Sequence, residues 1–185
     1  MTKIAVLVGS LRKESFSKKI AKNVMSLFPN EFETEIIPIG DLPLYNQDFD
    51  DEGNPPQQWK VFREKMKEFD AVLFVTPEYN RSIPGVLKNA IDIGSRPKPD
   101  SVWNNKPAAI ISNSPGNLSG FGANHHLRQS IMCLNMPVVQ QPEAYLANVA
   151  ALFDDDGKIN NDGTVQFLQL LVDTFVKLIT TCKAN

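Results

Sequence analysis

The sequence has few of the residues that build disulfide frameworks and metal sites. Its 185 residues include two cysteines and two histidines. The cysteines, Cys133 and Cys182, lie far apart in the chain, and neither belongs to a Cys-x-x-Cys pair. This usage argues against a disulfide framework and against a zinc site. We expect both cysteines to be buried apolar side chains.

A strong charge of one sign and long apolar runs are also lacking. The formal net charge is −2, without a basic block or an acidic tail, so neither nucleic acid nor a membrane surface is expected as a partner. The apolar runs are shorter than the roughly 18 residues that span a bilayer, and the N-terminus shows no signal-peptide pattern. We therefore expect a cytoplasmic protein whose residues 1–185 form one domain.

The first loop of the chain lacks both common glycine-rich nucleotide fingerprints. The apolar run Ile4–Val8 leads into Gly9-Ser10-Leu11-Arg12-Lys13-Glu14-Ser15-Phe16-Ser17, which has neither three spaced glycines nor a Gly-Lys-Ser/Thr ending. It does have a tight-turn glycine, three hydroxyls and two cations before the start of a predicted helix. Free N–H groups at a helix start favour an anion. The alternative is that the serines only cap the helix and that the cations are solvated.

The apolar pattern alternates between strands and helices along the chain. Uninterrupted or loosely alternating apolar runs predict strands at Ile4–Val8, Glu33–Ile39, Ala71–Val75, Pro107–Ile111 and Val138–Val139. Helical spacing predicts helices at Phe16–Phe28, Trp59–Phe69, Pro84–Ile93, Ala123–Leu134 and Val165–Cys182. The segment from Asp41 to Gln58, rich in proline and acids, predicts a long surface loop.

Strands that alternate with helices predict an α/β fold with a parallel sheet. Five strands favour the flavodoxin-like, three-layer arrangement with strand order 2-1-3-4-5. In that order the carboxyl ends of the first, third and fourth strands meet at one crevice. Those ends carry the three unusual loops, at Gly9–Ser17, Thr76–Ser82 and Ser112–Gly122, so we expect the loops to form one binding site.

The second of these loops could support a planar ring. Thr76-Pro77-Glu78-Tyr79-Asn80 joins a rigid proline to a flat aromatic side chain, and its backbone groups could bond to ring heteroatoms. The Ser114-Pro115-Gly116 turn could contact the far edge of the same ring with backbone amides. The alternative is that Tyr79 covers the edge of the core and that Glu78 pairs with Arg81.

Three stretches together resemble the NAD(P)H-dependent FMN reductases, including the bacterial enzymes that reduce chromate and quinones. They are the Gly9–Ser17 loop, Thr76-Pro77-Glu78-Tyr79-Asn80 with the following Ser82-Ile83-Pro84-Gly85 and Leu87-Lys88-Asn89-Ala90-Ile91-Asp92, and His126-Leu127-Arg128-Gln129. The resemblance implies noncovalent FMN, with its phosphate in the first loop and its ring over Pro77–Asn80. The cofactor-binding residues expected from loop and resemblance together are Ser10, Arg12, Ser15, Phe16, Ser17, Pro77, Glu78, Tyr79, Asn80, Ser114 and Gly116.

The chain departs from the family's common pattern at three positions. Glu14 stands where glycine is common, Ser17 stands where asparagine is common, and Ile93 stands where tryptophan often follows Asp92. The Ser17 hydroxyl must therefore replace an amide. These departures bear on the choice of substrate more than on the identity of the cofactor.

The resemblance implies ping-pong transfer of hydride from NADPH or NADH through N5 of FMN to quinones, flavins or similar acceptors, with chromate and azo compounds as further candidates. No protein side chain is needed as a catalytic acid or base, and no metal is expected. We expect His125 and His126 to serve packing or subunit contacts, and Arg128 to pair with a carboxylate. The resemblance also implies a homodimer or homotetramer.

The main alternative is a flavodoxin-type electron carrier. Carriers usually have a threonine-rich phosphate loop, whereas this loop holds Arg12 and Lys13. The phosphatases and receiver domains of similar fold need a loop cysteine before an arginine, or clustered aspartates, and the sequence has neither at these strand ends. The sequence leaves the physiological acceptor and the choice between NADPH and NADH open.

Overall fold

The computed structural model of the chain describes residues 1–184 and contains a five-stranded, fully parallel sheet. The strand order is β2-β1-β3-β4-β5, which confirms the predicted flavodoxin-like order. The strands are β1 (Thr2–Val8), β2 (Phe32–Ile36), β3 (Ala71–Pro77), β4 (Ala108–Asn113) and β5 (Ala144–Leu146). The central strands β1, β3 and β4 are almost entirely buried, as expected for strands covered on both faces.

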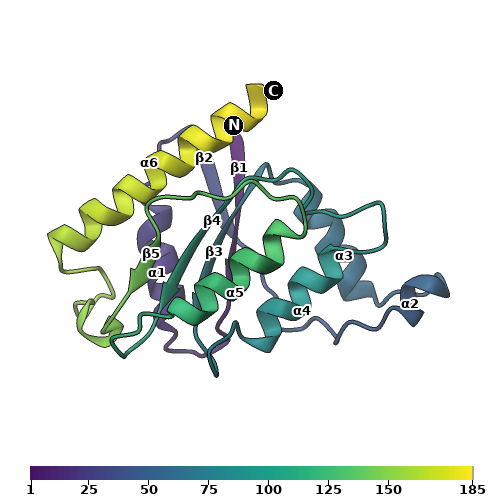
Figure 1. Ribbon diagram of the computed structural model, residues 1–185, viewed down its shortest axis with the longest axis horizontal. Coiled ribbons are helices and arrows are strands. Elements are labelled where there is room, and N and C mark those ends of the chain that lie inside the picture. The colour runs from purple at the N-terminus through teal and green to yellow at the C-terminus, as the bar shows by residue number, and fades with distance from the viewer. Residues whose placement is uncertain (185) are drawn as a thin grey trace.

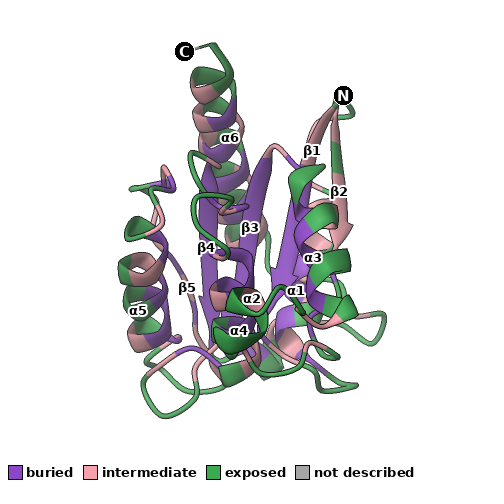
Figure 2. Ribbon diagram, turned by 90° about the vertical axis from the view of Figure 1, so that its right-hand side faces the viewer, coloured by how far each residue is buried: buried purple, intermediate pink, exposed green. Residues whose placement is uncertain are grey.

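Helices cover both faces of the sheet (Figure 1). They are α1 (Phe16–Met25), α2 (Asp48–Asp51), α3 (Gln57–Lys67), α4 (Gly85–Gly94), α5 (Phe121–Met132) and α6 (Asp162–Ala184), with a 3₁₀ turn at Val149–Ala151. Alternate side chains of each strand enter opposite layers. Ala5 and Leu7 of β1 pack under α3, α4 and α5, whereas Ile4 and Val6 pack under α1 and α6. Figure 2 shows the buried sheet between these layers.

The predicted fifth strand is wrong in position. Val138 and Val139 are buried, but they contact β4 only through an isolated bridge between Val138 and Ala108. The chain then turns through Gln141-Pro142 and pairs with the end of β4 as β5. A proline cannot donate to a strand ladder, so the fifth strand is split in two, with the regular part after Pro142.

The segment from Asp41 to Gln58 is largely the exposed loop that was predicted, with short regular parts that were not predicted. It contains the single-turn helix α2, which projects from the body in Figure 1, and its last residues begin α3. Side chains of the body fix its course. Asn89 bonds to the Leu42 and Pro43 carbonyls and to the Tyr45 N–H, and the Trp59 indole N–H donates to the Pro43 carbonyl.

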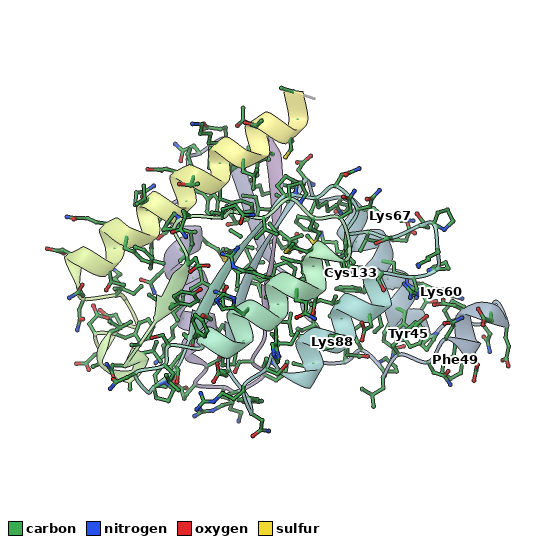
Figure 3. The ribbon with its side chains drawn as sticks, viewed as in Figure 1. Tyr45, Phe49, Lys60, Lys67, Lys88 and Cys133 are labelled. Carbon is green, nitrogen blue, oxygen red and sulfur yellow. The ribbon has the colours of Figure 1, made fainter. Side chains whose placement is uncertain are left out.

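The two cysteines are free, as expected, but they are not buried apolar side chains. Cys133 is the exposed C-cap of α5, and its side chain is labelled in Figure 3. Cys182 is half-buried because the C-terminal end of α6 extends beyond the strands (Figure 2). No cluster of metal-ligating side chains is found within residues 1–184.

One helix, α6, is long and apolar enough to cross a membrane if only length and composition are considered. This is weak evidence, because a helix that packs on the core of a protein passes the same test. In α6 the buried side chains are Leu168, Leu171, Val172, Phe175 and Ile179, which recur at helical spacing and face the sheet. Packing on the sheet therefore accounts for this stripe of α6, whose most apolar 18-residue window is 28% buried.

Candidate functional site

The three predicted loops meet at the carboxyl ends of β1, β3 and β4 around a cavity of about 220 Å³, here called the carboxyl-end cavity. Its lining comes from all three loops: Ser10, Arg12, Ser15, Phe16, Ser17, Pro77, Glu78, Tyr79, Asn113, Ser114 and Pro115. All the site residues predicted from the sequence line it except Asn80 and Gly116. Asn113 and Pro115 line it although they were not predicted as site residues.

The loop after β1 lies close to the end of β3. A side chain at Gly9 would place its Cβ 2.8 Å from the Thr76 hydroxyl oxygen, so only glycine permits this approach. The next turn of the loop ends at Ser15, the N-cap of α1, whose hydroxyl oxygen accepts the Lys18 N–H at 3.1 Å. The first N–H groups of α1 therefore lie at the wall of the carboxyl-end cavity, where they favour an anion.

Two serine hydroxyls in this wall are buried and arranged as donors. Ser15 is 2% exposed and Ser17 is 1% exposed. The Ser15 oxygen accepts the Lys18 N–H, and the Ser17 oxygen accepts an N–H of the Asn113 side chain at 2.8 Å. No acceptor for either hydroxyl proton is found among residues 1–184, so both protons are available to a ligand in the cavity.

A guanidinium group also belongs to this wall. Arg12 lines the cavity and is exposed, and it forms no ion pair within the described part of the chain. Glu14 lies outside this wall: its carboxylate is 79% exposed and is 3.6 Å from the Lys19 ammonium. The wall therefore offers hydroxyl donors, helix N–H groups and a guanidinium, a donor set that suits a phosphate ester.

The loop after β3 closes as a tight hairpin. Tyr79 and Ser82 exchange two backbone hydrogen bonds of 2.9 Å, while Asn80 and Arg81 have φ values of 49° and 66°. Positive φ at both central positions defines a type I′ turn. The turn places Tyr79 at the cavity mouth, where it is 51% exposed. Tyr79 therefore does not cover the core edge, which was one alternative for this residue.

Glu78 fixes this hairpin to α5. Its carboxylate accepts the Ala123 N–H at 3.1 Å and the Arg81 guanidinium at 2.6 Å, the pairing that the sequence left open. Burial opposes ionisation of Glu78, but the Ala123 and Gly122 N–H groups and Arg81 outweigh it and lower the pKa of this carboxyl group. A Cβ at Gly122 would lie 2.9 Å from the Arg81 carbonyl oxygen, so this contact needs glycine.

The two predicted residues outside the cavity have other roles. Asn80 occupies the tip of the type I′ turn, beyond the residues that line the cavity. The Gly116 N–H donates to the Ser114 hydroxyl oxygen at 3.1 Å, which occupies the amide that was expected to meet a ligand. The neighbouring Pro115 lines the wall in its place.

The histidines and the arginine of α5 lie outside the carboxyl-end cavity. His126 is 3.0 Å from the Ser82 hydroxyl, and His125 is 3.1 Å from the hydroxyl of Tyr145. Burial, and to a smaller extent the Glu143 carboxylate, raises the pKa of Tyr145 to about 12. The prediction that Arg128 pairs with a carboxylate is wrong. Its guanidinium instead donates to the Asn124 side-chain oxygen and to the Val139 carbonyl, both at 3.0 Å.

Comparison with known proteins places this geometry among flavin-dependent reductases. Residues 2–151 match the family model of NADPH-dependent FMN reductases. A quinone reductase of Pseudomonas putida is 55% identical over 98% of this chain and 96% of its own. A 2-hydroxy-1,4-benzoquinone reductase of a Burkholderia species is 43% identical over 94% of this chain and 93% of its own. The solved structure of FerB, a flavoenzyme NAD(P)H:(acceptor) oxidoreductase of Paracoccus denitrificans, matches with a TM-score of 0.90 at 38% identity, covering 98% of both chains.

Proposed function

This chain belongs to the NADPH-dependent FMN reductase family, and on that premise we propose that it uses noncovalently bound FMN to reduce quinones with electrons from NADPH or NADH. The observation that carries the proposal is the convergence of three strand-end loops on one cavity whose wall holds two buried, donor-oriented serines at a helix start. Related flavins, chromate and azo compounds are further candidate acceptors.

The residues of the carboxyl-end cavity fit FMN at its phosphate end. Ser10, Ser15 and Ser17 offer hydroxyls, Arg12 offers a guanidinium, and the first turn of α1 offers N–H groups. Phe16 adds an apolar side chain to the same wall. We assign the phosphate to this wall because hydrogen bonds between charged groups and phosphate are the strong ones.

The other side of the cavity fits a flat ring. Pro77, Tyr79, Ser114 and Pro115 line it, with Glu78 held away from the mouth by Arg81 and α5. FMN, when bound, supplies the acceptance of hydride from NAD(P)H and its delivery to an oxidised substrate. The protein's own part is to bind and orient the ring and to keep one face open. Glu78 is the carboxylate in the cavity wall, and its lowered pKa keeps it ionised at neutral pH, which makes it unsuited to donate a proton.

We also propose that the protein is cytoplasmic and that residues 1–185 form one FMN-binding domain. We propose that it assembles as a homodimer or a homotetramer. Trp59, Leu87 and Ile91 are buried within their own chain and therefore offer no contact to a second subunit. The support that remains is the exposed apolar rim of Tyr79, Leu118 and Phe121 on the loops that form the site. At about 220 Å³ the cavity is also smaller than most ligand pockets, which leaves room for a wall from a second subunit. Light scattering that gives 20.6 kDa for the active, FMN-bound protein would exclude the oligomer.

The proposed function is tested first with the purified full-length protein. We expect an oxidised-flavin absorption spectrum that NADPH or NADH bleaches and that a benzoquinone restores. Initial rates with both substrates varied should give parallel double-reciprocal lines, because one open ring face serves both substrates in turn. Intersecting lines, or a protein without flavin that gains no activity with added FMN, would contradict the proposal.

A variant of Arg12 tests the assignment of the phosphate. Arg12→Ala should weaken FMN binding by about 1.5–3 kcal/mol and riboflavin binding much less, because riboflavin lacks the phosphate. Lys13→Ala is the matched control, since Lys13 is an exposed neighbouring cation that does not line the cavity. Equal losses of FMN and riboflavin in Arg12→Ala would contradict a phosphate contact at this position.

A further inference from the structure

Asn113 is a buried polar residue at the floor of the carboxyl-end cavity that the proposed function does not use. It is the last residue of β4 and is 2% exposed. Its side-chain nitrogen donates to the Ser17 hydroxyl oxygen at 2.8 Å and to the Thr76 carbonyl oxygen at 3.1 Å. The side chain therefore joins β4 to the end of β3 and to the first turn of α1.

The orientation of this amide is fixed by Thr76. A backbone carbonyl oxygen can only accept, so the nitrogen of the amide, and not its oxygen, must face Thr76. The same nitrogen then faces Ser17, and because it carries only protons on that side, the Ser17 oxygen must accept. This leaves the Ser17 hydroxyl proton without an acceptor among residues 1–184 and available to the cavity.

We propose that Asn113 is a positioning residue for the phosphate end of the cofactor: it holds the Ser17 hydroxyl as an acceptor and so aims its proton into the carboxyl-end cavity. The proposal rests on the proposed function, because it takes the ligand at this wall to be a phosphate ester. Without Asn113 the Ser17 hydroxyl turns to other partners, and a donor to the phosphate is lost. The ring end of the site keeps its contacts.

The test compares two ligands that differ only in the phosphate. FMN and riboflavin are titrated against the full-length protein by equilibrium dialysis, and the ratio of their dissociation constants is measured. In Asn113→Leu the FMN affinity should fall about tenfold or more, while the riboflavin affinity falls by less than about threefold. In a Ser17→Ala background the same change should leave the ratio unaltered, because Ser17 is the group through which Asn113 acts.

Asn124→Leu is the matched control. Asn124 is also fully buried, on α5, where its side chain contacts the Ser112 hydroxyl and the Ala144 carbonyl, and it does not line the cavity. Its loss should lower the melting temperature while leaving the FMN-to-riboflavin ratio as in the wild type. Should Asn113→Leu fail to fold, Asn113→Ser carries the test, because a serine is too short to reach Ser17 and Thr76 together.

The proposal would be overturned if the Asn113 variants weaken FMN and riboflavin binding by the same factor and so keep the wild-type ratio. Asn113 would then be only a structural link between β3 and β4. A ratio that changes as much in the Ser17→Ala background as in the wild type would overturn it as well. If the wild type itself binds neither ligand, the proposed function fails. These outcomes are distinct, because wild-type binding is measured before any variant.

Discussion

The ion pair between Arg63 and Asp50 gives a sharp prediction about stability. The two guanidinium nitrogens donate to the two carboxylate oxygens at 2.7 Å, and the side chains are 8% and 5% exposed. A third guanidinium nitrogen donates to the Ile93 carbonyl oxygen at 2.9 Å. Asp50→Ala therefore leaves a buried charge that is still held in place by Ile93 but has lost its counterion.

The expected loss follows from this burial. Removing one partner of a buried ion pair costs about 3–5 kcal/mol, since the remaining charge stays desolvated. For 185 residues, an unfolding entropy of about 2.1 cal/mol/K per residue converts this loss to a fall in Tm of about 8–13 °C. The assay is thermal unfolding followed by circular dichroism at one fixed FMN concentration, since a bound ligand itself raises Tm.

Two further variants isolate the cause. Glu64→Ala removes one partner of an exposed ion pair with Lys67 on the same helix and should cost less than about 1 kcal/mol. The double change of Asp50→Leu with Arg63→Met should cost less than Asp50→Ala alone, because no buried charge is left over. The reasoning is refuted if Asp50→Ala lowers Tm no more than Glu64→Ala does. Tyr45 and Phe49, which Figure 3 labels, pack on Trp59, whose ring centroid lies 5.5 Å from the Arg63 guanidinium.

Two more predictions concern single positions outside the site. Gly94→Ala should lower the free energy of unfolding, measured by urea titration, by about 1–3 kcal/mol, because the new Cβ would lie 2.6 Å from the buried Trp103 ring. Gly85→Ala is the control in the same helix and should not lower it, because a Cβ there would have nothing within 4 Å. Burial lowers the pKa of Lys106 to about 8 from 10.5, so between these values the unfolded chain holds a proton that the folded chain lacks. Wild-type stability should therefore rise with pH across that range relative to Lys106→Met, and a flat or falling difference would contradict the assignment.

The sheet could be predicted from the sequence because its central strands are buried on both faces. β1, β3 and β4 show unbroken apolar runs, and such runs need no knowledge of distant partners. The fifth strand could not be placed the same way. Val138 and Val139 are as buried as strand residues, but burial alone does not tell a ladder from an isolated bridge.

The segment before α3 shows a second limit. Its acids and prolines gave no periodicity and predicted solvated loop residues, yet the Asp50 side chain is 5% exposed because its partner lies on α3. Nothing near Asp50 in the sequence marks it apart from Asp48 or Asp51. The difference is made by a guanidinium that the fold brings alongside, and such pairing is not encoded locally.

The loops of the site could be predicted because parallel strands place their carboxyl ends together. Asn113 was missed because the direction of its side chain depends on where β4 ends. Along β4, Ala108 and Ile110 face the layer of α3, α4 and α5, and Ser112 follows them by contacting Asn124 of α5. The alternate residues Ala109 and Ile111 face α1 and α6, so Asn113 points to Ser17 of α1. Had the strand been extended by two residues beyond Ile111, this alternation would have placed Asn113 against the first loop. Strand ends are the least certain part of such a prediction, and the alternation of faces can be applied only as far as the strand continues. A polar side chain at a strand end is therefore assigned to a site only once the strand's true end is known.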